Sequence, residues 1–135
     1  MDLSDSLFVS AAGLKVQGAR LKVISQNLAN ADSMATTPGG DPYRRKMVTF
    51  RSALDKALGL TTVQLDKVVE DKSEFQKKLD PAHPAADAQG YVKLPNVNAL
   101  VELADMREAQ RTYEANLKAI EASRTMLQRT VDILR

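Results

Sequence analysis

The stretch that decides the fold of this chain is residues 98–134, NALVELADMREAQRTYEANLKAIEASRTMLQRTVDIL. It contains no Pro and no Gly, and a large apolar residue recurs in it every seven positions. These residues are Met106, Tyr113, Ile120, Leu127 and Leu134. Such a repeat is typical of a long amphipathic helix of the coiled-coil type. At 1.5 Å per residue the helix would be roughly 55 Å long, and its apolar stripe requires a partner.

A second seven-residue repeat lies near the N-terminus and predicts another helix over about residues 3–30. Its apolar positions are Leu7, Leu14, Leu21 and Leu28. Gly13 and Gly18 lie inside it and each lowers helix propensity by about 1 kcal/mol relative to Ala. They indicate either a helix weakened at its centre or a close approach of two helix backbones.

Two Asn residues mark the end of this first helix. Asn27 and Asn30 are poor interior residues, and Asn tolerates the left-handed conformation of a helix C-cap. We therefore expect the helix to stop there.

All five Pro residues lie between Pro38 and Pro95, which predicts a separate, non-helical middle segment. Residues 44–50 have the pattern of a strand, and residues 52–58 that of a short helical turn. Alternating apolar residues predict a β-hairpin of 62–70 with 74–79 around a turn at 71–73. A short extended piece is expected at 91–94, and Asn96 or Asn98 is a natural N-cap for the last helix.

The predicted fold is therefore mainly α with a small β segment. The long N- and C-terminal helices form an antiparallel coiled-coil pair, with the β-hairpin and loops in the middle. The expected parts are 1–31 (first helix), 32–95 (middle segment) and 96–135 (last helix). Two such helices alone are marginal, because their thin apolar stripes barely offset the backbone entropy of ordering them. We expect them to be loose in the monomer and to order when copies pack together.

Composition excludes several functional classes. The net charge is +2, so no strong field draws nucleic acid, and the chain has no Cys for a disulfide, a thiolate metal site or a nucleophile. No apolar run is long enough to span a membrane. The N-terminus carries Asp2 and Asp5 where a secretory signal needs basic residues, so we expect no cleaved signal. Amphipathic helices lying on a membrane are the disfavoured alternative, because neither polar face is dominated by Lys and Arg.

Few residues offer chemistry. His83 is the only His, and with Asp80 and Asp87 it makes at most a weak metal site in a Pro-containing loop. The basic cluster 44–46 could grip a phosphate or nucleic acid, but strand surface or an acidic partner is favoured. We expect no catalytic residue, no metal and no cofactor, and hence no enzyme.

Four motifs then carry a family resemblance that covers essentially the whole chain. The first motif, SQNLAN at 25–30, contains Ser25, Asn27, Ala29 and Asn30 and resembles the signature of the bacterial flagellar axial proteins, the rod and hook components. The runs PYRRK at 42–46, DPAHPAADAQGYVKLPNVN at 80–98 and RTYEAN at 111–116 are similar to the proximal-rod members of that family. The run DSMATT at 32–37 departs from the usual Thr-x-Gly-Tyr ending.

The resemblance implies a structural subunit of the proximal rod in the flagellar basal body. Such proteins are exported unfolded through the flagellar type III apparatus, without cleavage. They polymerise with copies of themselves and other rod proteins into a periplasmic drive shaft, whose terminal helices wall an export channel. No nucleic acid, small-molecule substrate or membrane embedding is implied.

The resemblance also assigns roles to residues. The nine apolar stripe residues given above would pack subunits together, while Asn27 and Asn30 would hydrogen-bond across the helix end. Candidates for contacts from the outer segment are Tyr43, Arg44, Arg45, Tyr91 and Asn96. Alternatives are another rod subunit, a helical-hairpin secretion adaptor or chaperone, and a metal-dependent cell-wall hydrolase centred on His83.

Overall fold

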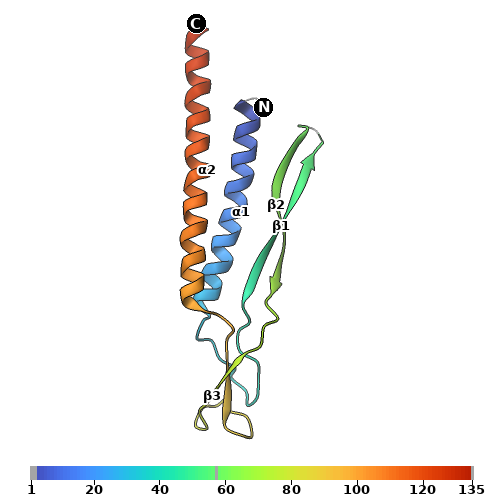
Figure 1. Ribbon diagram of the computed structural model, residues 1–135, viewed down its shortest axis with the longest axis vertical. Helices are drawn as coiled ribbons and strands as arrows, with labels where there is room; N and C mark the ends of the chain where they lie inside the picture. Colours follow the sequence, from blue (N-terminus) through green and yellow to red (C-terminus); the bar gives the residue numbers. More distant parts are fainter. Residues whose placement is uncertain (1–2, 57, 135) are drawn as a thin grey trace. The chain divides into compact units, whose positions relative to one another are not determined.

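The computed structural model describes residues 3–56 and 58–134. Its elements follow the order α1 (Leu3–Ala29), β1 (Lys46–Asp55), β2 (Leu60–Glu70), β3 (Gln76–Leu79), β4 (Tyr91–Leu94) and α2 (Ala99–Ile133) (Figure 1). Two long terminal helices enclose a small antiparallel β segment in the sequence, which confirms the predicted fold class.

The strands form two separate two-stranded ribbons. In the first, β1 pairs with β2. In the second, β3 pairs antiparallel with β4, from Gln76 opposite Leu94 to Leu79 opposite Tyr91. The predicted hairpin of 62–70 with 74–79 is therefore wrong, because β2 and β3 each take another partner.

The helical turn predicted at 52–58 is also wrong over the described residues. Residues 52–55 continue β1, and a turn that includes Gly59 leads into β2. Gly59 has φ of +65°, a conformation that L side chains rarely adopt, so this position suits Gly. Residue 57 lies outside the described residues.

The chain divides into two compact units, each built from several segments. Unit 1 contains residues 1–21, 48–67 and 107–135, that is, the first part of α1, most of the β1–β2 ribbon and most of α2. Unit 2 contains residues 22–47 and 68–106, that is, the end of α1, the β3–β4 ribbon and the start of α2.

Each unit has a small core. In unit 1 the buried side chains include Val16 and Ala109, and in unit 2 they include Val23, Ile24 and Val92. Asn98 caps α2, because its side-chain oxygen accepts hydrogen bonds from the amides of Leu100 (3.1 Å) and Val101 (3.4 Å). Of the two predicted caps, Asn98 is therefore the one used.

Candidate functional site: a polar junction and unpartnered apolar faces

Within unit 1, α1 and α2 meet through small and polar side chains. The hydroxyls of Ser6 and Ser123 lie 3.3 Å apart, and the Arg20 guanidinium lies 3.5 Å from the Glu108 carboxylate. A Cβ added to Gly13 would lie 2.9 Å from the side-chain nitrogen of Asn116. Residue numbers on α2 fall as those on α1 rise, so the helices are antiparallel.

The two helix glycines therefore differ in role. Gly13 allows a close approach to α2, whereas a Cβ at Gly18 would meet nothing within 4 Å. Of the two glycines, only Gly13 therefore marks a close approach of two helix backbones.

None of the nine predicted packing residues is fully buried. Buried seam positions in unit 1 include Ser10, Val16, Ala109 and Ser123. Among the predicted packing residues, Tyr113 is 37% exposed and Leu134 82% exposed. The others are half-buried: Leu7, Leu14, Leu21, Leu28, Met106, Ile120 and Leu127. The seam thus fixes helix register with small groups and leaves large apolar groups accessible.

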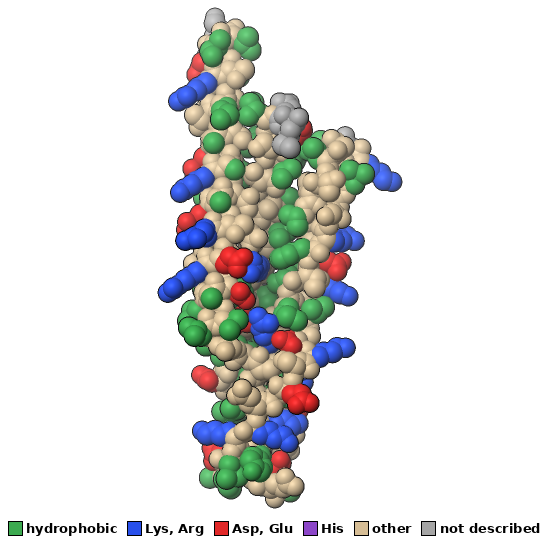
Figure 2. Space-filling view, in the orientation of Figure 1, with side chains coloured by type: hydrophobic (Ala, Val, Ile, Leu, Met, Phe, Trp, Pro, Cys, Tyr) green, Lys and Arg blue, Asp and Glu red, His purple; other side chains and the backbone are tan. Residues whose placement is uncertain are grey.

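The β1–β2 ribbon adds a second accessible apolar surface. The Thr49 hydroxyl lies 3.3 Å from the Asp66 carboxylate, so these side chains share one face. By alternation, Phe50 and Leu54 of β1 share the opposite face with Val63 and Leu65 of β2. That face is apolar, and its members are 38–61% exposed. Figure 2 shows hydrophobic side chains gathered along this ribbon and at the free end of α2.

Unit 2 contains a buried polar junction centred on Asn27, which is 1% exposed. Its side-chain nitrogen donates to the Lys46 carbonyl (2.8 Å) and to the Glu102 carboxylate (3.1 Å). Its side-chain oxygen accepts from the Tyr43 hydroxyl (3.0 Å) and the Lys46 amide (2.9 Å). Every donor and acceptor position of this amide is thus used.

Glu102 is the buried acid of the junction and is also 1% exposed. Besides Asn27, its carboxylate accepts a short hydrogen bond from Nε of Arg45. The other guanidinium nitrogens of Arg45 lie 3.5 Å from Asp71 and 3.6 Å from Asp105. One Arg therefore neutralises a carboxylate that has almost no access to water.

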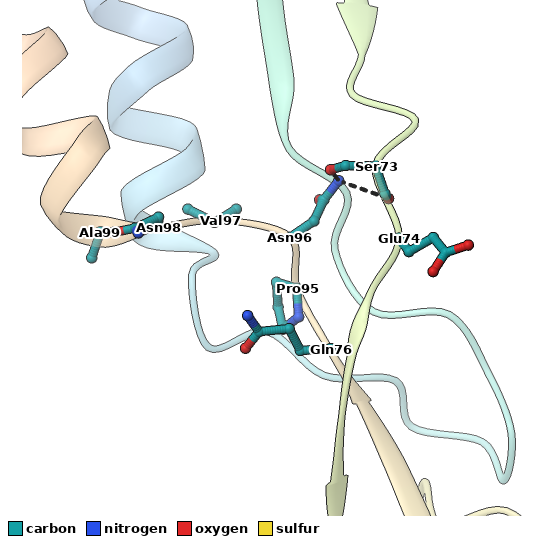
Figure 3. Close-up of a pocket in the computed structure, with 8 residues that line it drawn as sticks. All are labelled: Ser73, Glu74, Gln76, Pro95, Asn96, Val97, Asn98 and Ala99. Carbon is teal, nitrogen blue, oxygen red and sulfur yellow. Dashed lines mark hydrogen bonds between the residues drawn. The ribbon is translucent and has the colours of Figure 1, made fainter.

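Asn96 and Arg44 tie residues 71–73 to this junction. The Asn96 oxygen accepts from the Arg45 amide (2.7 Å), and its nitrogen donates to the Asp71 carbonyl (3.0 Å) and the Ser73 hydroxyl (2.9 Å). The Arg44 guanidinium donates to the Asp71 carbonyl (2.9 Å) and lies 4.1 Å from the centre of the Phe75 ring. Figure 3 shows Asn96 reaching Ser73 beside an open groove.

The charges of the junction shift several pKa values. The pKa of Asp71 is below its ordinary 3.8, chiefly because the Ser73 amide donates to the carboxylate and also because of Arg45. The pKa of Tyr43 is above 10.0 because of burial and then the negative charges of Glu102 and Glu70. For Arg45, burial lowers the pKa, but Glu102 and Asp71 together raise it, so the guanidinium stays charged.

The structure brings together Asn27, Tyr43, Arg44, Arg45 and Asn96 of the predicted residues. Tyr91 lies elsewhere, in β4, and is 40% exposed; Ser25 and Ala29 are exposed on α1. Sequence reasoning missed Glu102, and it predicted Asp71 only as part of a turn at 71–73. The available signal was a carboxylate at residue 102, seven positions before the buried Ala109 on the same face of α2.

The end of α1 does not use the expected left-handed Asn. No non-glycine residue in the described ranges has a positive φ. Instead the Asn30 side chain donates to the Gln26 carbonyl (2.8 Å) and accepts from the Ser33 hydroxyl (3.1 Å). The helix therefore ends through side-chain hydrogen bonds to its last turn.

His83 has a local structural contact. Its Nδ1 accepts a hydrogen bond from the Ala85 amide at 3.0 Å. The described residues contain no cluster of three or more His, Cys, Asp or Glu side chains that could hold a metal. No described helix is long and apolar enough to cross a membrane.

Comparisons with known proteins give a consistent result. A family model described as "Flagellar basal body rod FlgEFG protein C-terminal" matches residues 88–133. The chain is 49% identical over 133 residues to the flagellar basal-body rod protein FlgC of Agrobacterium fabrum, covering 98% of this chain and 96% of that protein. It is 39% identical over 152 residues to FlgC of Borreliella burgdorferi, covering 99% of each. For FlgC of Salmonella typhimurium the identity is 37% over 135 residues, covering 98% of each.

Proposed function

This chain belongs to the FlgC family of flagellar basal-body rod proteins, and from that premise we propose that it builds the rod through apolar side chains outside its own helix seam. It is a structural subunit of the flagellar basal body and assembles with other rod components. The proposal concerns which surfaces bind the neighbouring subunits and how those surfaces transmit torque.

One observation supports the proposal most directly. The α1–α2 seam approaches closely at Gly13 and buries the small polar residues Ser10 and Ser123, while large apolar groups such as Tyr113 and Leu117 are 37% and 41% exposed. A helix pair normally buries its large apolar groups in its own seam. Here they remain available to neighbouring subunits, and fully burying a Leu stabilises an interface by about 1.5–3 kcal/mol.

The separation of roles between the helix seam and the exposed apolar groups gives a mechanism for torque transmission. Shape-specific packing of many apolar side chains resists sliding between neighbours, because close-packed interiors have low compressibility. The polar junction of unit 2 supports this resistance by holding the end of α1 against the start of α2. Asn27 and Glu102 would lose their hydrogen-bond partners if these two segments separated.

Several finer points belong to the same proposal. The neighbours include copies of this chain as well as other rod proteins, and together they form a periplasmic drive shaft around an export channel. The chain travels through the flagellar type III apparatus and plays no catalytic role. The predicted subunit-packing residues and the outer contacts of Arg44, Arg45 and Tyr43 are part of this proposal.

The test replaces one exposed apolar residue of α2. Leu117→Asp places a charge on the outer face of the helix, where the monomer loses little but an apolar interface would have to bury the charge. Cells carrying it as their only copy should be non-motile, and the protein should be missing from purified basal bodies. Gln110→Asp, also on an exposed position of α2, is the matched control and should leave motility unchanged.

Equal motility of the two variants, with Leu117→Asp present in basal bodies, would remove this face from the assembly. Cellular levels of both variants, measured by immunoblot, separate failed assembly from failed folding.

A further inference from the structure

The β3–β4 ribbon of unit 2 places two lysines directly opposite each other. The Asp80 amide donates to the Gly90 carbonyl (2.9 Å), so these two residues form a hydrogen-bonded pair of the antiparallel ladder. Such pairs alternate with pairs that exchange no hydrogen bond, and Lys77 opposite Lys93 is of this second kind, with Cα atoms about 4.5 Å apart. Their side chains share one face of the ribbon, where like charges repel. A negative ligand group at this face would relieve the repulsion.

A groove with a volume of about 420 Å³ lies beside this lysine pair. Four cationic side chains and two carboxylates line it: Arg44, Lys72, Lys77 and Lys93, with Asp41 and Glu74. One of the carboxylates, Asp41, lies 2.7 Å from the Lys93 ammonium. Figure 2 shows Lys and Arg side chains on the surface around the β3–β4 ribbon. The groove lining is therefore positive, although the chain as a whole has a net charge of only +2.

Arg44 is held in the groove by neutral partners. Its guanidinium donates to the carbonyls of Asp71 (2.9 Å) and Ser73 (3.1 Å) and lies 4.1 Å from the centre of the Phe75 ring. These contacts fix the side chain without cancelling its charge. Because the guanidinium is already positioned, it loses little side-chain entropy when it binds an anionic group.

Beside the groove, β3 offers a free strand edge. Among the described residues β3 pairs only with β4, and all four of its residues are exposed. Gln76 and Lys78 direct their backbone groups toward β4, because they alternate with the hydrogen-bonded pair at Asp80. The backbone groups of Lys77 and Leu79 therefore point to the free edge. An extended peptide can add to such an edge through main-chain hydrogen bonds.

We propose that the edge of β3 and its groove bind an extended acidic segment of another protein. The backbone of the segment pairs with β3, and its carboxylates lie over the cationic lining. Alternate side chains of a strand share one face, so the segment needs acidic residues at i and i+2. This chain has no two acidic residues at that spacing, and the lysines of β3 repel a second β3. A copy of the same chain therefore does not supply the segment.

Fluorescence anisotropy of a labelled synthetic peptide, titrated with the full chain, tests the proposal. The probe is a nonapeptide in which Glu and Thr alternate. One control peptide has Gln in place of every Glu, and a second keeps every Glu but is N-methylated at each amide, so that it cannot donate hydrogen bonds to a strand edge. Both controls should bind about tenfold more weakly than the probe, because binding needs the carboxylates and the main-chain hydrogen bonds together.

Lys77→Glu and Lys78→Glu are the matched variants of the chain. Both lysines are exposed on β3, but only Lys77 lines the groove, and Lys78 lies on the other face of the ribbon. Lys77→Glu should weaken binding of the probe about tenfold, because it places a like charge in the groove. Lys78→Glu changes the net charge equally but should weaken binding by less than about threefold, because solvent and salt screen it. Circular dichroism checks that both variants are folded.

Four results would overturn the proposal. Equal weakening by the two variants would indicate general attraction between opposite charges, and equal binding of the Gln peptide would show that the carboxylates are not recognised. Equal binding of the N-methylated peptide would show that β3 adds no strand. No binding of the probe at about 1 mM chain would exclude the site altogether. The proposed function is judged separately, by motility of the Leu117→Asp and Gln110→Asp variants.

Discussion

Glu102 sets the chemistry of the junction at the residue scale. A carboxylate that is 1% exposed needs charged and hydrogen-bonding partners, and it obtains them from Arg45 and Asn27. The three residues come from α2, from the position just before β1 and from α1, so one carboxylate joins three chain segments within unit 2. The pair favours this arrangement, because an arrangement that kept Glu102 buried without Arg45 would leave its charge unpaired.

The Arg45–Glu102 pair should show strong energetic coupling. Arg45→Met alone leaves the buried Glu102 carboxylate without its positive partner and should lower the free energy of unfolding by about 3–5 kcal/mol. Arg45→Met with Glu102→Met should lower it by less than the two single changes added together, with a coupling of about 1–3 kcal/mol. Urea unfolding followed by tyrosine fluorescence measures this.

Arg44→Met is the matched control for that cycle. Arg44 donates to the Asp71 carbonyl and stacks on Phe75, and neither of these contacts involves Glu102. Combined with Glu102→Met it should give nearly additive losses. Additive losses for the Arg45 pair would show that the pair does not couple the segments.

Acid should weaken unit 2. The folded-state pKa of Asp71 lies below its ordinary 3.8, so its carboxylate contributes stability that is fully present above 3.8 and lost as the pH falls through the folded value. The pKa values of Asp41, held by Lys93, and of Asp87, held by the Tyr91 amide, are lowered as well. Unfolding free energy should therefore decline below about pH 4.

Asp71→Asn provides the control for the acid prediction. It removes one of the three titrations, so its stability should fall less steeply with acid than that of the natural chain. Urea midpoints measured from about pH 6 to about pH 3 compare the two slopes. Parallel slopes would mean that Asp71 is not stabilised as a carboxylate.

At the scale of elements, the helix pair shows how far sequence patterns reach. The helices, the strand at 91–94 and the cap at Asn98 followed from periodicity and capping chemistry. The close approach at Gly13 and the burial of Ser123 did not follow, because the strongest apolar repeat marks the face with the largest side chains. Periodicity identifies an apolar face but cannot say whether its partner belongs to the same chain.

The strand pairing failed for a related reason. Residues 71–73 have the composition of a tight turn, yet their backbone is held by Arg44 and Asn96 from distant parts of the sequence. The β strand at 52–55 was missed because Ala53 and Leu54 also suit a helix. Long-range hydrogen bonds decided the first case and pairing with β2 decided the second, and local propensity contains neither.

The two helix glycines should respond differently to Ala. Gly18→Ala should stabilise α1 by about 0.5–1 kcal/mol, because it adds helix propensity in open space. Gly13→Ala should gain less or lose stability, since its Cβ would lie 2.9 Å from the Asn116 side chain. Thermal melts followed by circular dichroism compare the variants, and Asn116→Ala should restore the gain at Gly13. An equal gain at both positions would show that the helices do not approach closely there.

At the scale of the whole molecule, the two units share one property. Each leaves large apolar groups exposed, on the β1–β2 ribbon and on α2 in unit 1 and at the start of α2 in unit 2. Contiguous exposed apolar surface on a protein usually marks an interaction site. A subunit built in this way is completed by its neighbours, which suits a protein of the flagellar rod.

Sedimentation equilibrium combined with circular dichroism, over a wide range of protein concentration, tests whether neighbouring copies complete this subunit. We expect average mass and helix content to rise together with concentration, because neighbouring copies cover the exposed apolar faces and order the terminal helices. A chain that stays monomeric at every concentration, with full and constant helicity and a sharp thermal transition, would contradict it.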